Sequence, residues 1–523
     1  MSKINISKDF LKENILPLVS AVAMASPFLF YSAGWLSLVC VIPFLYYLHY
    51  ISKNKSGNNY LFSIWAVGII FFFIVVGWIL NTRPDNWAYI EGWQGSIGLL
   101  IIYLIVVFIL SLQFLIFALI YRKLKIDLLS KWTFAVLPAI WVVSEYLRSV
   151  LFSVITYGPN GSIGQFWNFG VLGFGAGVTP LGFGARLVGL FGLSFVLVAI
   201  NLSVFWLMHK RWKLPVLVFV ATILLSVFGW AMFNTPSGSD VSISIIQLAP
   251  TDDNSLTTDY QTELNNIMSL QNISQSSIDM LLLPEYSEFF ISGGKSASDI
   301  ADQYMVPNGG AITSINSQDT ANPSNDLVVY NRVGEITSMH QKQFLIPLGE
   351  FMPYIIEALL RATGQSEALE INKTTQNIKR GDKKEPPVIV ASRTVGALAC
   401  SGAIAPELYR SMVIQGAEVL TNSASLGTFT YAPLYHAQTR QMARFNAIAN
   451  ARPYIQASTG AYSYAIDQNG KFVFRTTKTG LNHQQINVET NKNLTWYSRL
   501  GEWVALVSLI IIATLLVRAY SRK

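Results

Sequence analysis

The sequence is poor in charged residues and in cysteine, and both shortages narrow the class of protein. Only 13% of its 523 residues are charged, whereas 52% are hydrophobic and the mean hydropathy is +0.40. A composition this apolar excludes an ordinary soluble protein and indicates that part of the chain lies in lipid. Of the two cysteines, Cys40 lies in an apolar run and Cys400 stands alone in the polar half. The polar half therefore cannot hold an internal disulfide framework.

Eight apolar stretches approach the length of about 20 residues that crosses a bilayer core. They cover residues 14–33, 35–50, 60–80, 95–121, 133–152, 184–208, 214–233 and 502–520. The second stretch is short, and its uncertain boundary with the first leaves seven spans as an alternative. We read the first as a membrane anchor, because it lacks the small-residue cleavage site of a signal peptide. The predicted organisation is a transmembrane domain of seven spans over 1–234, and an eighth helix with a cytoplasmic tail over 500–523.

The distribution of Lys and Arg predicts the orientation of these spans, because short cytoplasmic loops are rich in both. One set of alternate connections holds most basic residues near the spans, including Arg122, Lys210 and Arg518. In the opposite set, one short loop has only Arg83, and the connection 153–183 has no Lys or Arg. With eight spans, both termini are cytoplasmic and the large polar domain is extracytoplasmic. The net charge of +7 thus reflects membrane orientation, and we expect no nucleic-acid partner.

Residues 240–490 show the alternation of short β-rich runs with helical and turn segments that is typical of a layered α/β domain. The candidate strands are 241–250, 280–286, 325–331, 387–392, 394–400, 417–423 and 453–458, followed by a hairpin over 461–476. Asn469-Gly470 is a strong signal for the tight turn of that hairpin. The candidate helices are 260–274, 406–415 and 433–451, and the polar segment 363–386 is expected to be a mobile insertion.

Glu145 and Arg148 stand at positions i and i+3 near the outer end of the fifth span. Ionisable groups at membrane depth are costly and tend to pair or to face a cavity. The sequence leaves both interpretations open: a structural ion pair, or residues that line a substrate site.

Three polar residues stand at or near the ends of strand-like runs, where open α/β sheets place their active groups. Glu285 follows MLLLP, Lys342 precedes Gln343-Phe344-Leu345, and Cys400 ends TVGALAC. Each alone has an ordinary alternative, namely an ion-paired carboxylate, a surface lysine or a small buried hydrophobe. An unpaired thiol in an extracytoplasmic domain, however, needs a reason to be kept. Together they supply the base, the cation and the nucleophile for acyl transfer through a thioester.

These residues and the motifs around them resemble the apolipoprotein N-acyltransferases of the bacterial membrane, which join a multi-span membrane part to a nitrilase-like domain. The similarity covers nearly the whole chain. Its most specific pieces are SEYLR (144–148), LPE (283–285), PLGEFMP (347–353), PEL (406–408), QMAR (441–444) and ANARP (449–453). The resemblance implies a multi-span α-helical membrane domain and an extracytoplasmic nitrilase-like domain with an αββα sandwich.

The resemblance also implies a role for each matched residue. Glu285 would be the general base, Lys342 the oxyanion stabiliser and Cys400 the acyl-accepting nucleophile. Glu350 would be a supporting carboxylate, and the backbone N–H of Ser401 would belong to the oxyanion site.

The family's reaction moves an acyl chain from a phospholipid onto the cysteine, and then onto the α-amino group of a lipoprotein's diacylglyceryl-cysteine. The implied partners are a phospholipid donor, an apolipoprotein acceptor and membrane lipid. The implied location is the bacterial inner membrane, with the catalytic domain periplasmic. Neither a cofactor nor a metal is expected.

The sequence departs from the family directly after the nucleophile. An aromatic residue and a carboxylate normally follow the cysteine, whereas Ser401 and Gly402 follow Cys400 here. This departure favours an alternative function, either a membrane-anchored nitrilase-type amidase or an N-acyltransferase for a different amine. A catalytically silent protein that binds lipid or lipoprotein is a third alternative, and the presence of Glu285, Lys342 and Cys400 argues against it.

Overall fold

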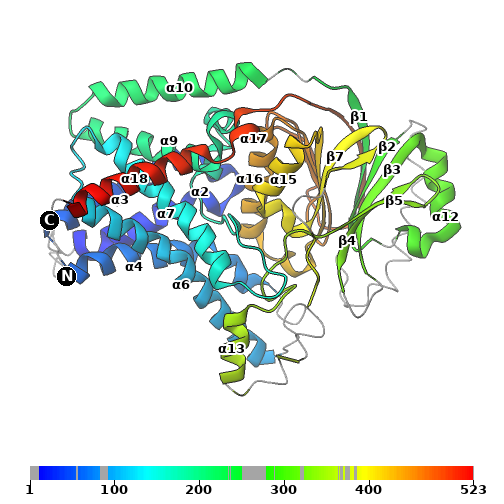
Figure 1. Ribbon diagram of the computed structural model, residues 1–523, viewed down its shortest axis with the longest axis horizontal. Coiled ribbons are helices and arrows are strands. Elements are labelled where there is room, and N and C mark those ends of the chain that lie inside the picture. The colour runs from blue at the N-terminus through cyan, green and yellow to red at the C-terminus, as the bar shows by residue number, and fades with distance from the viewer. Residues whose placement is uncertain are drawn as a thin grey trace, which may run out of the picture.

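The computed structural model divides the chain into a helical half and an α/β half, with one long helix, α16, at their junction (Figure 1). It describes residues 11–54, 57–82, 92–233, 235, 237–249, 278–287, 289–317, 323–362, 364, 369–370, 377–381 and 386–521. The helix predicted over 260–274 and most of the insertion predicted over 363–386 lie outside the described residues.

Long apolar runs form the helical half, because a backbone in lipid must satisfy its polar groups internally. Its elements are η1 (Leu11–Ile15), α2 (Leu16–Leu29), η2 (Tyr31–Leu38), α3 (Ile42–Asn54), α4 (Gly57–Val75), η3 (Gly77–Asn81), α6 (Gly92–Leu124), α7 (Thr133–Ile155), α8 (Gly173–Ala176), η4 (Pro180–Gly184), α9 (Ala185–Met208) and α10 (Lys213–Phe233). Two helices from the other end of the chain, α17 (Trp496–Leu500) and α18 (Trp503–Ser521), complete this half.

Six helices among the described residues are long and apolar enough to cross a membrane. The number rises to seven if the pair Tyr31–Leu38 and Ile42–Asn54, which is bent by 44°, forms one span. The first predicted span contains only the shorter apolar helix Glu13–Leu29. The helices agree with a membrane protein, and the count of eight spans stays a prediction.

The α/β half contains two six-stranded sheets, in the orders β12-β1-β2-β3-β4-β5 and β11-β10-β9-β8-β7-β6. The first sheet contains β1 (Asp240–Gln247), β2 (Ile278–Glu285), β3 (Met305–Asn316), β4 (Asn325–Asn331), β5 (Ile336–Gln341) and β12 (Asn482–Glu489). The second contains β6 (Val388–Val390), β7 (Arg393–Ala399), β8 (Val419–Ser425), β9 (Tyr454–Thr459), β10 (Tyr464–Ile466) and β11 (Phe472–Arg475). The helices of this half are α12 (Phe289–Tyr304), α13 (Tyr354–Ala362), η5 (Cys400–Ile404), α15 (Pro406–Ile414), η6 (Gly427–Phe429) and α16 (Pro433–Asn450).

The two sheets pack face to face, because alternate strand residues are apolar and point between them. Ile243 and Met280 of the first sheet and Val395 and Ile455 of the second share one buried cluster. Helix α12 covers the outer face of the first sheet, and α15 and α16 cover that of the second. The strands β1, β2 and β3 run parallel, as do β7, β8 and β9. The expected fold class, a helical membrane part with an αββα sandwich, is confirmed.

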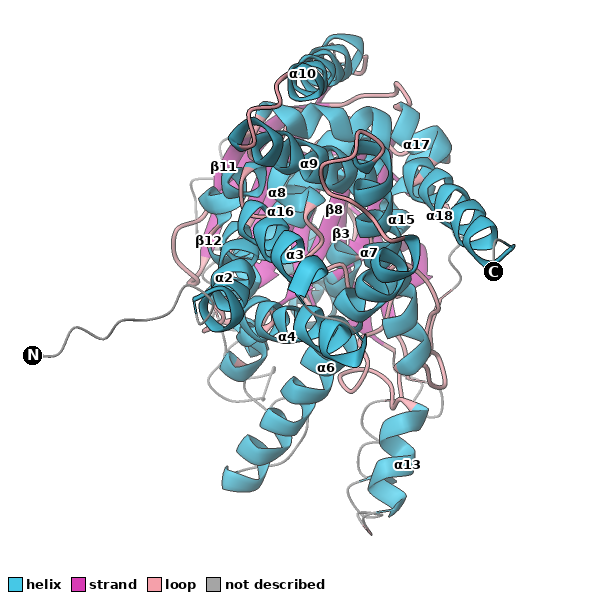
Figure 2. Cartoon of the chain, turned by 90° about the vertical axis from the view of Figure 1, so that its left-hand side faces the viewer, coloured by secondary structure: helices cyan, strands magenta, loops and turns pink. Residues whose placement is uncertain are grey.

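Helix α16 and the hairpin β10–β11 connect the sandwich to the helical half. Gln441 Nε2 donates to the carbonyl of Pro27 at 2.9 Å, and Gln438 Nε2 donates to that of Val75 at 2.8 Å. From the other side, the buried Arg186 of α9 donates to the carbonyls of Ile448 and Gln468 at 3.2 and 2.7 Å. One hydrophobic core continues from the membrane helices into the layer of α15 and α16. The α/β half is therefore packed directly on the helical half (Figure 2).

Candidate active site

Glu285 ends β2 and is 4% exposed. Its Oε1 accepts hydrogen bonds from Asn325 Nδ2 at 2.6 Å and from Lys342 Nζ at 3.0 Å. Its Oε2 accepts one from the backbone N–H of Ser425 at 3.1 Å. Ser425 ends β8, so this carboxylate joins the ends of strands from two different sheets. Charge-assisted bonds of this kind hold a buried carboxylate in one orientation.

Lys342 follows directly after β5 and is 5% exposed. Its Nζ lies 3.0 Å from Glu285 Oε1 and 2.6 Å from Glu350 Oε1. Burial lowers the pKa of Lys342, but the two carboxylates outweigh burial and raise that pKa well above its usual value. The ammonium group therefore stays charged and can stabilise an oxyanion that forms beside it.

Glu350 holds Lys342 from the opposite side. It is 8% exposed, and its Oε2 accepts a hydrogen bond from the backbone N–H of Ile346 at 2.8 Å. Burial raises the pKa of Glu350, although the positive charge of Lys342 opposes this effect. The hydrogen bond between Glu350 and the backbone of Ile346 holds the two ends of a tight turn together. Within this turn, Leu348 has a left-handed backbone conformation with φ +67°.

Cys400 follows β7 and begins η5, in a left-handed backbone conformation with φ +37°. Such strain in a residue other than glycine persists only where the surrounding structure enforces it, and it is common at active sites. The Sγ donates to the carbonyl of Ser425 at 3.5 Å, and Asn422 Nδ2 donates to the carbonyl of Cys400 at 3.3 Å. Burial and the negative charge of Glu285 raise the pKa of the thiol well above its usual value. The resting thiol is therefore protonated and needs a base to react.

The two residues after Cys400 are packed against their surroundings. Ser401 is 2% exposed, and its Oγ donates to the carbonyl of Phe344 at 2.5 Å. It lies in the first turn of η5, where backbone N–H groups lack an acceptor within the helix. At Gly402, an added Cβ would lie 2.5 Å from the Cβ of Leu398. A carboxylate-bearing residue therefore cannot replace Gly402 without a shift of β7 or η5.

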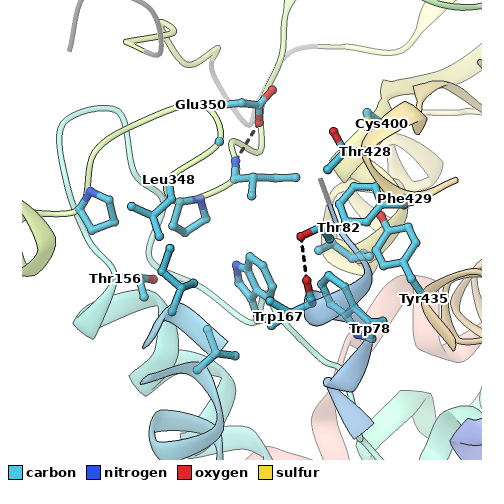
Figure 3. A pocket seen from close by; sticks show the side chains of 18 of the residues that line it. Trp78, Thr82, Thr156, Trp167, Leu348, Glu350, Cys400, Thr428, Phe429 and Tyr435 are labelled. Atoms are coloured by element: carbon cyan, nitrogen blue, oxygen red, sulfur yellow. Dashed lines mark hydrogen bonds between the residues drawn. The ribbon is translucent and has the colours of Figure 1, made fainter. Parts of the chain in front are cut away.

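These groups line one cavity with a volume of about 960 Å³. Figure 3 shows Glu350 and Cys400 on one side of the cavity, and Trp78 and Trp167 on another. The wall continues along helix α6 through Ile102, Ile105, Val106 and Ile109. The cavity thus has a charged end at the sheets and an apolar end among helices of the membrane part.

Glu145 and Arg148 do not pair directly with each other, and neither lines this cavity. Glu145 Oε1 accepts hydrogen bonds from Trp141 Nε1 and from the backbone N–H of Leu172, both at 2.9 Å. Arg148 Nη1 donates to the carbonyls of Trp167 and Phe169 at 3.3 and 3.0 Å. The two side chains therefore fasten the segment 167–172 to α7, and through it they position Trp167 and Phe169 in the cavity wall.

The structure brings Glu285, Lys342, Glu350 and Cys400 together on the wall of the cavity. The site also contains Asn325, which is not predicted from the sequence. Its Nδ2 donates to Glu285 Oε1 and to the Tyr286 hydroxyl, the latter at 3.1 Å. Asn325 begins a strand that is predicted from the sequence. A polar residue at the end of a predicted strand is a candidate site residue, so the sequence could have indicated Asn325. Ser425 donates to Glu285 through its backbone N–H. Any residue type except proline could make this bond, so the sequence does not predict it.

Two family models match the chain in succession. Residues 20–203 match the apolipoprotein N-acyltransferase N-terminal domain, and residues 242–490 match the carbon-nitrogen hydrolase family. The apolipoprotein N-acyltransferase of Pasteurella multocida is 24% identical over 495 residues, which cover 87% of this chain and 85% of that protein. That of Shewanella oneidensis is 24% identical over 71% of this chain and 70% of its own length.

A carbon-nitrogen hydrolase of Helicobacter pylori G27 is a structural neighbour at 16% identity. It covers 52% of this chain and 94% of its own, with a TM-score of 0.36. The family matches and the long apolar helices together define a membrane protein with a domain of the carbon-nitrogen hydrolase family. Residues 20–203 match the N-terminal domain of apolipoprotein N-acyltransferases, and relatives that bear this name align with most of the chain, so the resemblance seen in the sequence is confirmed. The matches support a general role in lipoprotein N-acylation.

Glu350→Ala is expected to lower the turnover rate about 10²- to 10³-fold, as much as the loss of Glu285, because Lys342 loses one of its two anionic partners. Glu350→Gln keeps a hydrogen-bond acceptor for Lys342 and should retain part of the activity. Turnover of a diacylated lipopeptide with a phospholipid donor measures both. Glu357→Ala, which removes the partner of Arg361 on α13, is the control. Full activity of Glu350→Ala would show that Lys342 needs only Glu285.

Proposed function

We propose that this protein transfers an acyl chain from a membrane phospholipid, through a thioester on Cys400, to the N-terminal amine of diacylglyceryl-cysteine in apolipoproteins. Glu285 is the general base, and Lys342 stabilises the oxyanion together with the backbone N–H of Ser401. Glu350 is a positioning residue, because it contacts Lys342 and Ile346.

In the first half-reaction, Glu285 takes the thiol proton and Cys400 Sγ attacks the carbonyl carbon of the phospholipid ester. The negative charge that develops on the carbonyl oxygen is stabilised by Lys342. The ester C–O bond then breaks, and the proton held by Glu285 passes to the leaving oxygen of the lysophospholipid. The raised pKa of the thiol makes this base necessary, because little thiolate is present beforehand.

In the second half-reaction, the lipoprotein amine attacks the thioester carbon and a second tetrahedral oxyanion forms beside Lys342. Glu285 takes a proton from the amine, the C–S bond breaks, and the thiolate regains the proton. Both substrates are anchored in lipid, which suits a catalytic domain that is packed on membrane helices.

The extent of the cavity is the main support for this proposal. It extends from Cys400 to Ile102, Ile105, Val106 and Ile109 of a helix that is apolar enough to cross a membrane. Its volume of about 960 Å³ lies near the upper end of the range of about 300–1,000 Å³ for small-molecule sites. A hydrolase for small soluble amides has no use for such an apolar extension, whereas a long acyl chain fits it.

Ile105→Trp tests the proposed acyl path. We expect transfer of a hexadecanoyl chain to fall about tenfold or more while transfer of an octanoyl chain falls less than about twofold, because the larger ring fills the distant part of the cavity. Ile101→Trp is the matched control, since Ile101 lies on the same helix and is 47% exposed. An equal loss with both donors would place the acyl chain elsewhere and would favour the amidase alternative.

We also propose that the catalytic domain lies outside the cytoplasm, on the periplasmic side. The asymmetry of Lys and Arg between alternate connections supports this orientation. A periplasm-active reporter fused near Asn469 is expected to be active, and a cytoplasm-active reporter at the same site silent. The reverse pattern would contradict the proposed orientation.

A further inference from the structure

A cluster of arginines lies apart from the cavity, where the end of α2 meets α16 and β11. Arg440 and Arg444 of α16 and Arg475 of β11 gather around Tyr31, the first residue of η2. Arg444 Nη1 donates to the Tyr31 hydroxyl at 2.9 Å, and the Cζ atoms of Arg440 and Arg444 lie 5.8 and 6.0 Å from the Tyr31 ring centre. Arg475 lies 5.7 Å from the ring of Phe472, which packs edge-on against Tyr31 at 5.3 Å.

The positive charge of this arginine cluster has no counter-ion in the described part of the chain. None of the three guanidinium groups lies within 4.0 Å of a carboxylate there. Arg440 Nε donates to the carbonyl of its own helix at His436, and the buried Arg444 Nε has no hydrogen-bond partner among the described atoms. Like charges held together in this way repel one another unless an anion binds between them.

The neighbours of the arginine cluster indicate where the anion comes from. Tyr31 follows the apolar helix Glu13–Leu29, so the cluster lies at the end of an apolar helix of the helical half. Phe30 is 68% exposed and Trp35 is 56% exposed, and exposed aromatic side chains are typical of the membrane–water interface. Guanidinium groups bind phosphate oxygens in pairs of hydrogen bonds, and basic pockets between membrane helices bind lipid head groups.

We propose that Arg440, Arg444 and Arg475 bind the phosphate of a membrane phospholipid, with Phe30 and Trp35 against its acyl chains. This site is separate from the cavity of Cys400, since none of these residues lines that cavity. It fastens the α16 side of the catalytic domain to the leaflet that this domain faces. The proposal rests on the charges and contacts of the cluster and does not depend on the acyl-transfer chemistry.

The test counts lipid molecules bound to the full-length protein in detergent, in a Cys400→Ala background that prevents turnover. The probe is dihexanoylphosphatidylglycerol, followed by equilibrium dialysis. We expect Arg440→Gln/Arg475→Gln to bind one molecule fewer, or to weaken that site about tenfold or more. Arg440→Lys/Arg475→Lys should keep the molecule with lower affinity. Arg332→Gln removes an ion pair with Asp302 outside this cluster. This control variant should bind the lipid with the same stoichiometry and affinity as Cys400→Ala alone.

Unchanged lipid stoichiometry and affinity in the glutamine variant would overturn the proposal. If that variant does not fold, the single change Arg475→Gln carries the test, because Arg475 is exposed and its loss should still weaken binding severalfold. Inorganic phosphate distinguishes the two sources of the anion. At the same concentration as the lipid it should not displace the bound molecule, and displacement would show a site for free phosphate.

Discussion

Cys400→Ala is expected to lower N-acylation by about 10⁴-fold or more, because the variant loses the thiol on which the proposed acyl-enzyme forms. The change removes one sulfur atom from a position that packs against the core. Its effect on folding should therefore be small, about 1 kcal/mol in the free energy of unfolding. Initial rates of lipopeptide acylation and the thermal unfolding midpoint measure the two effects separately.

The other cysteine supplies the matched control for this change. Cys40 is 3% exposed and lies in the helical half, outside the cavity wall. Cys40→Ala removes the same atom from a more deeply buried position and should leave the acylation rate within about twofold. Wild-type activity in Cys400→Ala would exclude the thioester mechanism, whatever the behaviour of Cys40→Ala.

Glu285→Gln and Lys342→Met are each expected to lower the rate about 10²- to 10³-fold. Glutamine keeps the shape of Glu285 but cannot take the thiol proton. Methionine keeps the apolar stem of Lys342 but removes the charge beside the oxyanion. Two surface changes, Glu335→Gln and Lys492→Met, serve as controls because both residues are exposed, and they should leave the rate within about twofold.

The double variant Glu285→Gln/Lys342→Met tests whether the two residues act together. Their side chains touch at 3.0 Å and act in the same step, so the double variant should be little worse than the poorer single variant. Single-turnover acylation of Cys400 is the measurement. Fully additive losses would mean that each residue has an independent structural role.

Much of the second sheet could be predicted from the sequence, because its central strands are apolar and end at clear turn signals. β7, β8 and β9 lie within about two residues of the predicted ranges. In the first sheet, β3, β5 and β12 were not predicted. β3 begins with Met305-Val306-Pro307-Asn308-Gly309-Gly310, a composition typical of a turn, and its pairing with β2 and β4 overrides that local preference.

The two other strands escape prediction for a different reason. β5 and β12 are the edge strands of their sheet, and the sequences ITSMHQ and NHQQINVE are largely polar. An edge strand exposes one long side to water and needs little apolar patterning. Its position is set by backbone hydrogen bonds to a neighbour that is distant in sequence.

The residue types of the site could be predicted from the sequence, but their mutual geometry could not. Glu285, Lys342 and Cys400 stand at the ends of three strands, and only the packing of the two sheets brings those strand ends to one cavity. The contact of Glu285 with the backbone of Ser425 spans 140 positions of the chain. The lack of room at Gly402 likewise depends on its contact with Leu398. The absence of the family's carboxylate after Cys400 is thus accompanied by local packing that leaves no space for it.

In the proposed mechanism, Cys400 carries the acyl group between phospholipid and lipoprotein. The most direct measurement is the intact mass of the full-length protein after incubation with a dihexadecanoyl phospholipid, with peptide mapping of the adduct. We predict one hexadecanoyl group on Cys400, which hydroxylamine releases and which a diacylated lipopeptide removes to form its N-acylated product. Formation of that product without any adduct on Cys400, or an adduct that the lipopeptide cannot discharge, would exclude the thioester mechanism.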